Sequence, residues 1–590
     1  MKASDYIASL IAQQGVHHVF GYIGGMITHL VDSLDKHDDV QFIQTYHEQT
    51  AAIAAEGYAI ESGKFGVAIC TSGPGVTNMM TGIADAYFGN IPVLYISGQV
   101  NTYEYKYNKP VRQQGFQEME VVNVVKPITK YAVMVDKAED LCYELEKAIY
   151  IATTGRKGPV MIDLPMNISR AEIDPKSMKH FQPSKLTSYE IDIDLIKNLI
   201  ESSSRPMVLL GGGSQGIEDK VNKFLQKSQM PVITSLMGRG ASDETYPNYI
   251  GMVGSYGNRA ANMCVAQTDL LIAIGTRLDT RQTGAMYQEF VKHGNIIHVD
   301  IDNNELDYHR LDNRVKVCAS SEAFIDTLMG SDISYGDYTL WNNWVKQIKG
   351  LYDQDHEIER FVENKSPYRF MQYLNTITNE GDIITADVGQ NEMWSAQTIK
   401  LKKGQKFVCS GGLAPMGFSL PVAIGMAFAN PHKRIYSING DGGFHMAVQS
   451  MLLISQYNLN IKVIVMNNES LGMITQFQHL YFEDRMAGTT ANGGYLIPDM
   501  RRIADAYGFR YKQMDDSELT SDGLNDDGFC LIDYHIDGLT TVSPKLEYNK
   551  PIDRPIPLLP EEEYNKINCK IMEINKLAGG GNTALLTLAA

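Results

Sequence analysis

The sequence predicts an α/β protein with three doubly wound domains, each built on a parallel sheet. Short apolar runs alternate with longer helical patterns in three successive blocks, which is typical of repeated strand–helix–strand units. The runs are apolar at nearly every position, as in strands that are covered on both faces. A chain of 590 residues is also too long for one hydrophobic core.

The first block covers residues 1–170 and contains an alanine-rich helical pattern at Thr50–Ile60. It is followed by the polar stretch 171–190, whose two prolines predict a linker. The predicted strands of the block are Val40–Tyr46, Gly66–Cys70, Pro92–Ser97 and Val160–Leu164.

The second block covers residues 191–330, and the polar and aromatic stretch 331–365 after it predicts a helical connection. The third block covers residues 366–545, and residues 546–590 form a C-terminal tail with several prolines. The predicted strands are Pro206–Leu210, Val232–Ser235, Leu270–Ile274 and Ile296–Asp300 in the second block, and Asp382–Ala386, Arg434–Asn439 and Lys462–Asn467 in the third.

Composition excludes several classes of function. A net charge of -17 argues against nucleic acid as a partner, because no broad basic field is available to neutralise phosphates. The seven cysteines form no CxxC pair, so buried reduced thiols are expected and a disulfide or zinc framework is not. The sequence contains no run of about 18 apolar residues, so no membrane span is expected. Its first residues predict an amphipathic helix and no signal peptide. We therefore expect a cytoplasmic protein.

The most informative stretch is Ile438–Asn468, where two apolar strands flank a helical pattern. The first strand ends in Gly440-Asp441-Gly442-Gly443, and the second ends in Asn467-Asn468. Glycines between a strand and a helix let backbone amides approach a phosphate. Asp441 and Asn468 would place two hard oxygen ligands for Mg²⁺ at one edge of a parallel sheet, and the carbonyl of Ser470 could supply a third. The competing interpretation is a glycine turn and an Asn-Asn loop without a ligand.

This pairing of GDG and NN at such a spacing resembles the signature of thiamine-diphosphate enzymes. The resemblance implies that Gly440, Gly442 and Gly443 bind the diphosphate, and that Asp441, Asn468 and Ser470 hold Mg²⁺. It also implies that Glu48, in the segment HEQTAAIAAEGYA, bonds the aminopyrimidine ring as a proton shuttle. The alternative for Glu48 is an exposed first-turn glutamate that the helix dipole favours.

Two further segments resemble cofactor-binding loops of the same enzymes. In Ser410–Leu420, Met416 would wedge the cofactor into its bent form, and the Ala414 carbonyl would accept from its amino group. In Asp387–Trp394, Gly389 and Gln390 would bind the diphosphate. The histidine that usually follows this glutamine is replaced by asparagine, which can still donate a hydrogen bond.

Over about residues 1–550 the chain resembles the catalytic subunit of acetolactate synthase. The resemblance rests on the segments GYIGG, TSGPGVTN, FQE and LGMITQFQ. It implies decarboxylation of pyruvate and transfer of the two-carbon unit to a second carbonyl compound. Gly25 and Gln117 would face the reacting carbon, with the Gly25 amide stabilising oxyanion charge. Met473 would contact the cofactor, and the substrate pocket would include Phe116, Arg281 and Phe477.

The second block resembles the FAD-binding domain of that family. Gly211, Gly212 and Gly213 follow a predicted strand, where bare backbone could approach a diphosphate, although a triple glycine alone is weakly specific. Arg277 offers planar donors for phosphate, and Asp300 ends the strand at which an adenosine contact is expected. FAD would then be structural, without redox turnover.

Several departures concern the acceptor. Phe477 stands where the family usually has tryptophan, Met166 replaces a lysine, and the loop Asn101–Arg112 is rich in tyrosine and lysine. These changes leave three reactions open. The two-carbon unit could be transferred to a 2-keto acid, or to a nucleotide-linked keto sugar. Alternatively, it could be oxidised through FAD, as in a pyruvate oxidase. A regulator without turnover is a further, non-enzymatic reading. The resemblance also implies a homodimer or homotetramer in which Glu48 of one subunit faces the diphosphate site of another.

Overall fold

The computed structural model describes residues 1–183, 189–519, 524 and 527–577 of the chain. It contains three six-stranded sheets and divides into two compact units. The first unit is Met1–Leu186, Asp382–Glu392 and Val408–Asp537; the second is Thr187–Gly381, Met393–Phe407 and Gly538–Ala590. Part of the predicted linker 171–190 and the end of the predicted tail lie outside the described residues.

The first sheet has the strand order β2-β1-β3-β4-β6-β5, and all of its pairs are parallel. Its predicted strands are confirmed to within a few residues. The strands are β1 (His18–Tyr22), β2 (Gln41–Gln44), β3 (Gly66–Cys70), β4 (Val93–Gln99), β5 (Tyr131–Met134) and β6 (Val160–Pro165), and the helices are α1 (Ala3–Gln13), α2 (Thr28–Asp35), α3 (Glu48–Ser62), α4 (Pro74–Gly89), α5 (Val121–Val125), α6 (Leu141–Thr153) and α7 (Met166–Ser169).

The second sheet has the order β12-β11-β10-β7-β8-β9 and is also wholly parallel. Its strands are β7 (Pro206–Leu210), β8 (Val232–Thr234), β9 (Tyr249–Met252), β10 (Leu270–Ile274), β11 (Asn295–Asp300) and β12 (Arg314–Cys318), and its helices are α8 (Ile193–Ser202), α9 (Glu218–Ser228), α10 (Arg259–Val265), α11 (Thr280–Thr283), α12 (Asn303–Asp307) and α13 (Ser321–Gly330).

Alternate residues of β7 enter two separate hydrophobic clusters. Met207 and Leu209 pack with α10 and with α14 (Thr339–Tyr352), whereas Val208 and Leu210 pack with α8, α9 and α13. Successive strand side chains point to opposite faces, so both faces of this sheet are covered. The prediction of a doubly wound, parallel architecture is confirmed.

The third sheet has the order β14-β13-β15-β16-β18-β17, and its pairs from β13 to β17 are parallel. Its strands are β13 (Ile383–Ala386), β14 (Lys406–Val408), β15 (Ile435–Gly440), β16 (Ile461–Asn467), β17 (Arg510–Met514) and β18 (Cys530–His535), and its helices are α16 (Ser366–Ile377), α17 (Gln390–Thr398), α18 (Ser419–Ala429), α19 (Asp441–Met446), α20 (Met451–Gln456), α21 (Gly472–Tyr481) and α22 (Met500–Tyr507).

The predicted helical connection 331–365 is confirmed as α14 and α15 (Gln354–Phe361). The tail contains a helix that the sequence analysis did not predict, α23 (Glu561–Leu577). Its Ile567 and Ile571 are buried in a cluster with residues of α10 and α14, so tertiary packing stabilises this charged segment as a helix.

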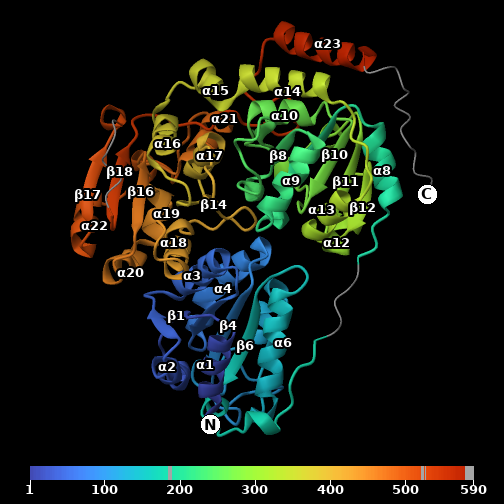
Figure 1. Ribbon diagram of the computed structural model, residues 1–590. Coiled ribbons are helices and arrows are strands. Elements are labelled where there is room, and N and C mark those ends of the chain that lie inside the picture. The colour runs from blue at the N-terminus through green and yellow to red at the C-terminus, as the bar shows by residue number, and fades with distance from the viewer. Residues whose placement is uncertain (184–188, 520–523, 525–526, 578–590) are drawn as a thin grey trace. The chain divides into compact units, whose positions relative to one another are not determined.

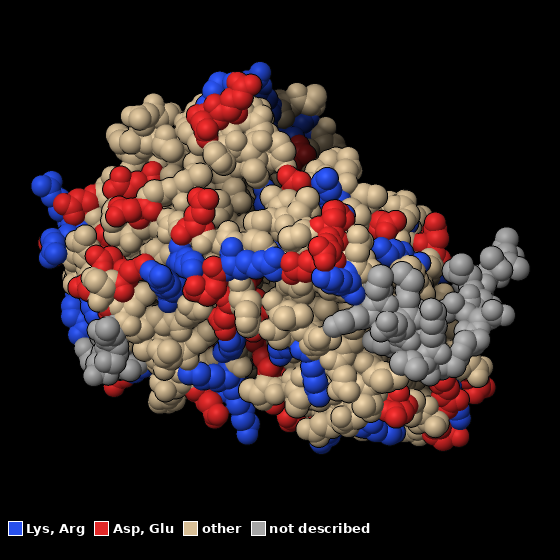
Figure 2. Space-filling model, turned by 90° about the horizontal axis from the view of Figure 1, so that it is seen from above, with Lys and Arg blue, Asp and Glu red and all other residues tan. Residues whose placement is uncertain are grey.

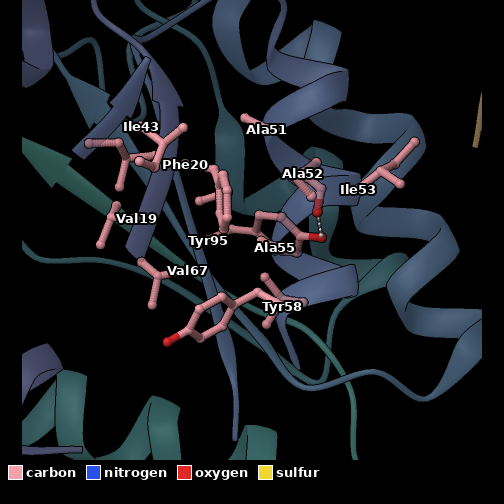
Figure 3. Close-up of a cluster of buried hydrophobic side chains, with 14 of the residues drawn as sticks. Val19, Phe20, Ile43, Ala51, Ala52, Ile53, Ala55, Tyr58, Val67 and Tyr95 are labelled. Carbon is pink, nitrogen blue, oxygen red and sulfur yellow. Dashed lines mark hydrogen bonds between the residues drawn. The ribbon is translucent and has the colours of Figure 1, made fainter. Parts of the chain in front are cut away.

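Within the first unit, α3 and α18 pack closely against each other (Figure 1). Alanines and a glycine make the close approach possible, because a Cβ on Gly57 would lie 2.0 Å from the Val422 carbonyl oxygen. Helix α3 also covers one face of the first sheet. Figure 3 shows Ala52, Ala55 and Tyr58 of α3 beside Val19, Phe20, Ile43, Val67 and Tyr95 of the strands.

The surface and the thiols agree with the composition. On the face shown in Figure 2, basic and acidic side chains are interspersed and form no broad basic field. Six cysteines in the described part of the chain are free thiols, and five of these are buried. Among the described residues, no helix is both long and apolar enough to cross a membrane.

Candidate active site

The first group of predicted site residues lies at the carboxyl ends of β1, β2 and β4, three strands of the first sheet. Gly25 follows β1, Glu48 follows β2, and Gln117 lies in the loop after β4. Carboxyl ends of parallel strands meet at one edge of a sheet, and ligands bind there in α/β proteins. The structure therefore places the three predicted catalytic residues along one edge.

Glu48 opens α3 with its side chain inside the protein. Only 6% of the residue is exposed, which contradicts the alternative of an exposed first-turn glutamate. Its Oε2 accepts a hydrogen bond of 2.9 Å from Asn78 Nδ2 on α4. The preceding His47 caps the helix by accepting from the Gln49 amide. Cap and hydrogen bond together fix the direction of the carboxylate.

Gln117 has a left-handed backbone with φ of 62°, an uncommon conformation for a residue with a side chain. The turn at Gly73 lies against it, because a Cβ on Gly73 would come within 2.9 Å of the Gln117 carbonyl oxygen. By contrast, apart from Gly25 and its two chain neighbours, no atom of the described residues lies within 4 Å of the Cβ position of Gly25. Phe116 is 78% exposed, so its side chain is open to a further molecule.

The second group lies at the carboxyl ends of three adjacent strands of the third sheet. Gly389 and Gln390 follow β13, Asp441 follows β15, and Asn468 follows β16. Gln390 Nε2 donates to Gln476 Oε1 at 3.1 Å. The strand register therefore brings the GDG and NN segments together, as the sequence analysis predicted.

Asp441 is 1% exposed and accepts a hydrogen bond of 2.6 Å from the Tyr495 hydroxyl. Burial raises the pKa of the Asp441 carboxyl to about 6, against the lowering effect of Tyr495 and of backbone N–H groups that include those of Ser470 and Asn468. The Ser470 amide also donates to Asn468 Oδ1 at 3.3 Å. The three predicted metal residues are thus neighbours, and a cation would compensate the buried carboxylate.

The backbone around these groups forms a cradle in which side chains do not fit. A Cβ on Gly472 would lie 2.1 Å from Gln390 Oε1 and 2.8 Å from Asn468 Nδ2. A Cβ on Gly443 would lie 2.5 Å from Asp387 Oδ1. Side-chain amides and a carboxylate lie here with bare backbone between them. Such a set of groups fits a diphosphate that is bound through Mg²⁺.

Asp387 connects the cradle to the Ala414–Met416 loop. The carboxylate is fully buried and accepts from the Gly417 amide at 3.0 Å and the Ser419 amide at 3.1 Å. Ala414 has a left-handed backbone with φ of 60°. The Met416 methyl group lies 3.3 Å from the Cβ position of Gly442. The loop predicted to shape the cofactor therefore borders the GDG turn.

Met473 and Phe477 lie on α21, which begins directly after the cradle. Met473 is half-buried, whereas Phe477 is 46% exposed and packs against Tyr481 with ring centroids 4.7 Å apart. Nearly half of the Phe477 side chain is therefore open to a further molecule.

The predicted FAD residues belong to the second unit and lie at the carboxyl ends of adjacent strands. Gly211, Gly212 and Gly213 follow β7, Arg277 follows β10, and Asp300 ends β11. Neighbouring β7 and β10 mark the point where the strand order reverses, a common ligand position.

The hydrogen bonds and ion pairs that these residues already make limit the roles predicted for them. The amides of Gly211 and Gly213 already donate to the Ile274 and Gly275 carbonyls, so these glycines permit close backbone approach and do not supply N–H donors. Asp300 Oδ1 accepts from the Asp302 amide, and Arg277 pairs with Asp279 at 3.4 Å. Arg281 is exposed and stacks over Tyr256; it belongs to a different unit from Phe116 and Phe477.

Three positioning residues were not assigned from the sequence: Asn78, Tyr495 and Asp387. Asn78 and Asp387 lie inside segments that carried the family resemblance, so those motifs contained a usable signal. Tyr495 lies 54 residues from Asp441 in a loop without a motif, and only the structure brings the two together.

Comparison with known proteins agrees with this geometry. Three family models match: thiamine pyrophosphate enzyme N-terminal TPP binding domain at residues 1–124, central domain at 193–328, and C-terminal TPP binding domain at 387–534. The chain therefore belongs to the thiamine pyrophosphate enzyme family.

Among individual relatives, it is similar to acetolactate synthase large subunits. A probable acetolactate synthase large subunit of Methanocaldococcus jannaschii is 36% identical over 86% of this chain and 87% of its own. The acetolactate synthase large subunit of Lactococcus lactis is 33% identical over 89% and 90%. The isozyme 2 large subunit of Escherichia coli is 34% identical over 92% and 97%.

Proposed function

We propose that this chain decarboxylates pyruvate and transfers the two-carbon unit to a 2-keto acid, giving acetolactate when pyruvate is also the acceptor. The observation that carries the proposal is the cradle at Gly472, bordered by Gln390, Asn468 and the buried Asp441. Its support comes from relatives named acetolactate synthase that align over most of the chain.

In this proposal the edge of the first sheet in one subunit and the edge of the third sheet in another hold one cofactor. Gly440, Gly442, Gly443, Gly389 and Gln390 bind the diphosphate, and Asp441, Asn468 and Ser470 hold Mg²⁺. Thiamine diphosphate, when bound, supplies the chemistry that cleaves and forms the bond next to the carbonyl. The protein's own part is to orient it with Ala414, Met416 and Met473.

Glu48 is the proposed proton carrier, oriented by Asn78. Gly25 and Gln117 are proposed to face the reacting carbon, and Phe116, Arg281 and Phe477 to line the path of the substrates. We also propose that FAD is held by Gly211–Gly213, Arg277 and Asp300, and that the domains are 1–170, 191–330 and 366–545. A homodimer or homotetramer completes the proposal, because Phe116 and Phe477 are open in the single chain.

Product analysis tests the function. Purified protein with pyruvate, thiamine diphosphate and Mg²⁺ is expected to form acetolactate from pyruvate alone. Consumption of pyruvate only after addition of a nucleotide-linked keto sugar would contradict this and support the second acceptor. Acetate and peroxide without a ligated product would support an oxidase. The similarity to the relatives does not favour either alternative.

The metal site has a separate test. Asp441→Asn is expected to raise the Mg²⁺ concentration needed for half-maximal thiamine diphosphate binding by about tenfold or more, because a buried anionic ligand is lost. Asp505→Asn, at an exposed position on α22, is the control. Unchanged Mg²⁺ dependence of Asp441→Asn would contradict the assignment.

A further inference from the structure

Two buried carboxyl groups in the first unit are not explained by the proposed mechanism. Glu56 on α3 is 0% exposed and Asp85 on α4 is 3% exposed. In the described part of the chain, neither carboxylate oxygen of Glu56 has a conventional hydrogen-bond donor. The side chain that interacts with Glu56 at this buried position is the Asp85 carboxyl, whose charge contributes to the raised pKa of Glu56.

Two ionised carboxylates cannot bond to each other, because both are acceptors only. Their contact inside the protein requires one proton between them. Burial, and then the charge of Asp85, raises the pKa of Glu56 well above its usual range. Burial also raises the pKa of Asp85 to about 6. Both shifts favour the neutral form of a carboxyl, so a proton is retained within the pair.

The pair is connected to the loop that is proposed to hold the cofactor. Asp85 Oδ1 accepts a hydrogen bond from the Ser410 hydroxyl, and Ser410 Oγ accepts one of 3.0 Å from the Ala414 amide. Ser410 is 4% exposed. Ala414 has a left-handed backbone, so this bond stabilises a conformation that alanine alone does not favour.

Glu56 also lies on the same helix as Glu48, eight residues further along. At 3.6 residues per turn this is about two turns, so the pair and the proposed proton carrier share one rigid element. The chain Glu56–Asp85–Ser410–Ala414 thus joins the helix of Glu48 to the loop of Ala414 and Met416.

We propose that Glu56 and Asp85 share one proton and, through Ser410, position the Ala414 loop for thiamine diphosphate. This inference rests on the proposed function, since it assigns positioning residues to the same cofactor site. Ser410 and Asp85 do not touch the reacting atoms; they fix the backbone of Ala414, whose carbonyl is proposed to accept from the amino group of the cofactor.

The test is the affinity of the full-length chain for thiamine diphosphate with Mg²⁺, measured by calorimetry beside thermal stability. Ser410→Ala is expected to weaken binding about tenfold, equivalent to about 1.4 kcal/mol. Ser450→Ala is the matched control, because Ser450 is also buried and also bonds to α3, through Thr50 at 3.1 Å. It is expected to change thermal stability without changing affinity.

A second pair of variants tests the shared proton. Glu56→Gln keeps an N–H that can donate to Asp85 and should bind within about twofold of the unchanged chain. Glu56→Leu provides no donor and should weaken binding as Ser410→Ala does. If Glu56→Leu does not fold, Ser410→Ala and Glu56→Gln decide the question.

Unchanged affinity in Ser410→Ala, or an equal loss in Ser450→Ala, would overturn the inference. So would an equal loss in Glu56→Gln and Glu56→Leu. Failure of the unchanged chain to bind thiamine diphosphate would instead overturn the proposed function, so the two failures are distinguishable.

Discussion

Glu48 is buried at the start of a helix, and the Asn78 side chain donates to one of its carboxylate oxygens and fixes it. General acid–base groups work when they are held within hydrogen-bond reach of the proton that they transfer. The same residue type elsewhere on α3 has a different environment. Glu61 pairs with Lys433 at 3.0 Å and has no place in the proposed site.

Glu48→Gln should therefore lower turnover by about 10²- to 10⁴-fold, the usual contribution of such a group. The amide oxygen can still accept from Asn78, so fold and cofactor binding should persist. Steady-state rates and thiamine diphosphate affinity provide the measurement. Glu61→Gln is the control and should retain turnover. Full activity in Glu48→Gln would contradict the assignment of the proton carrier.

His298 determines part of the pH dependence of stability. It is fully buried, its Nε2 lies 2.8 Å from the Thr276 carbonyl, and its Nδ1 accepts from Arg314 at 3.0 Å. Protonation would break the Arg314 bond. Burial is the main cause that lowers the pKa of His298 from 6.5 to about 4, and the charge of Arg314 adds to it.

Between pH 6.5 and 4 the unfolded chain therefore binds more protons at His298 than the folded chain, and stability falls as the pH falls. The loss should reach roughly 2 kcal/mol by pH 5. His298→Gln offers one acceptor and one donor group and cannot titrate, so its free energy of unfolding in urea should fall less over this range. His432→Gln, at an exposed position, should retain the full slope. Equal slopes in His298→Gln and the unchanged chain would refute the explanation.

At the scale of elements, the pair α3 and α18 shows how close packing requires glycine on both helices. A Cβ on Gly57 would lie 2.0 Å from the Val422 carbonyl oxygen, and one on Gly425 would lie 1.8 Å from the Ala54 carbonyl oxygen. Both contacts are with backbone, which cannot move aside as a flexible side chain can. The helices must separate if either glycine is replaced.

Gly57→Ala should lower the free energy of unfolding by about 1–3 kcal/mol, because overpacking outweighs the better helix propensity of alanine. Gly350→Ala provides the comparison, since Gly350 lies inside α14 and, apart from its chain neighbours and the backbone of its own helix, no atom of the described residues lies within 4 Å of its Cβ position. That variant should gain about 0.5–1 kcal/mol. Denaturant unfolding measures both, and a neutral Gly57→Ala would show that the two helices are not closely packed.

In the molecule as a whole, hydrogen bonds and ion pairs connect segments that lie far apart in the sequence. In the second unit, Arg259 and Glu357 form a buried ion pair at 2.7 Å, with each side chain 1% exposed. Arg259 also donates to the carbonyls of Pro555 and Pro557, and Ser543 donates to Glu357. Arg259 lies on α10 and Glu357 on α15. This ion pair therefore anchors the C-terminal segment to two helices of the second unit.

Arg259→Met should cost roughly 3–5 kcal/mol, because it leaves Glu357 buried without its partner. Limited proteolysis should then cut more readily after residue 537. The double variant Arg259→Met, Glu357→Leu should recover part of the loss, since no buried charge remains. Lys220→Met removes an exposed pair with Glu322 and Asp326 and should change stability by about 1 kcal/mol or less. A comparable loss in both single variants would contradict the role of burial.

Local sequence determined the parallel α/β class, the most apolar strands and the contents of both edges, whereas less apolar strands such as β5, β12 and β17 were not predicted. Apolar runs such as Pro206–Leu210 are buried on both faces, so their composition alone identifies them as central strands. The motifs around Glu48, Asp441 and Asn468 are continuous in sequence. Each directly follows an apolar strand pattern, so the sequence alone places these residues at the carboxyl ends of strands.

Tertiary structure decided the features that depend on residues far apart in the chain. The partners Tyr495 for Asp441 and Ser410 for Asp85 lie 54 and 325 residues away, and no local pattern encodes such a pair. The same holds for α23, whose sequence is charged and whose helix depends on burying Ile567 and Ile571. Backbone periodicity is a local property, whereas burial and hydrogen-bond partners are set only when the whole chain has packed.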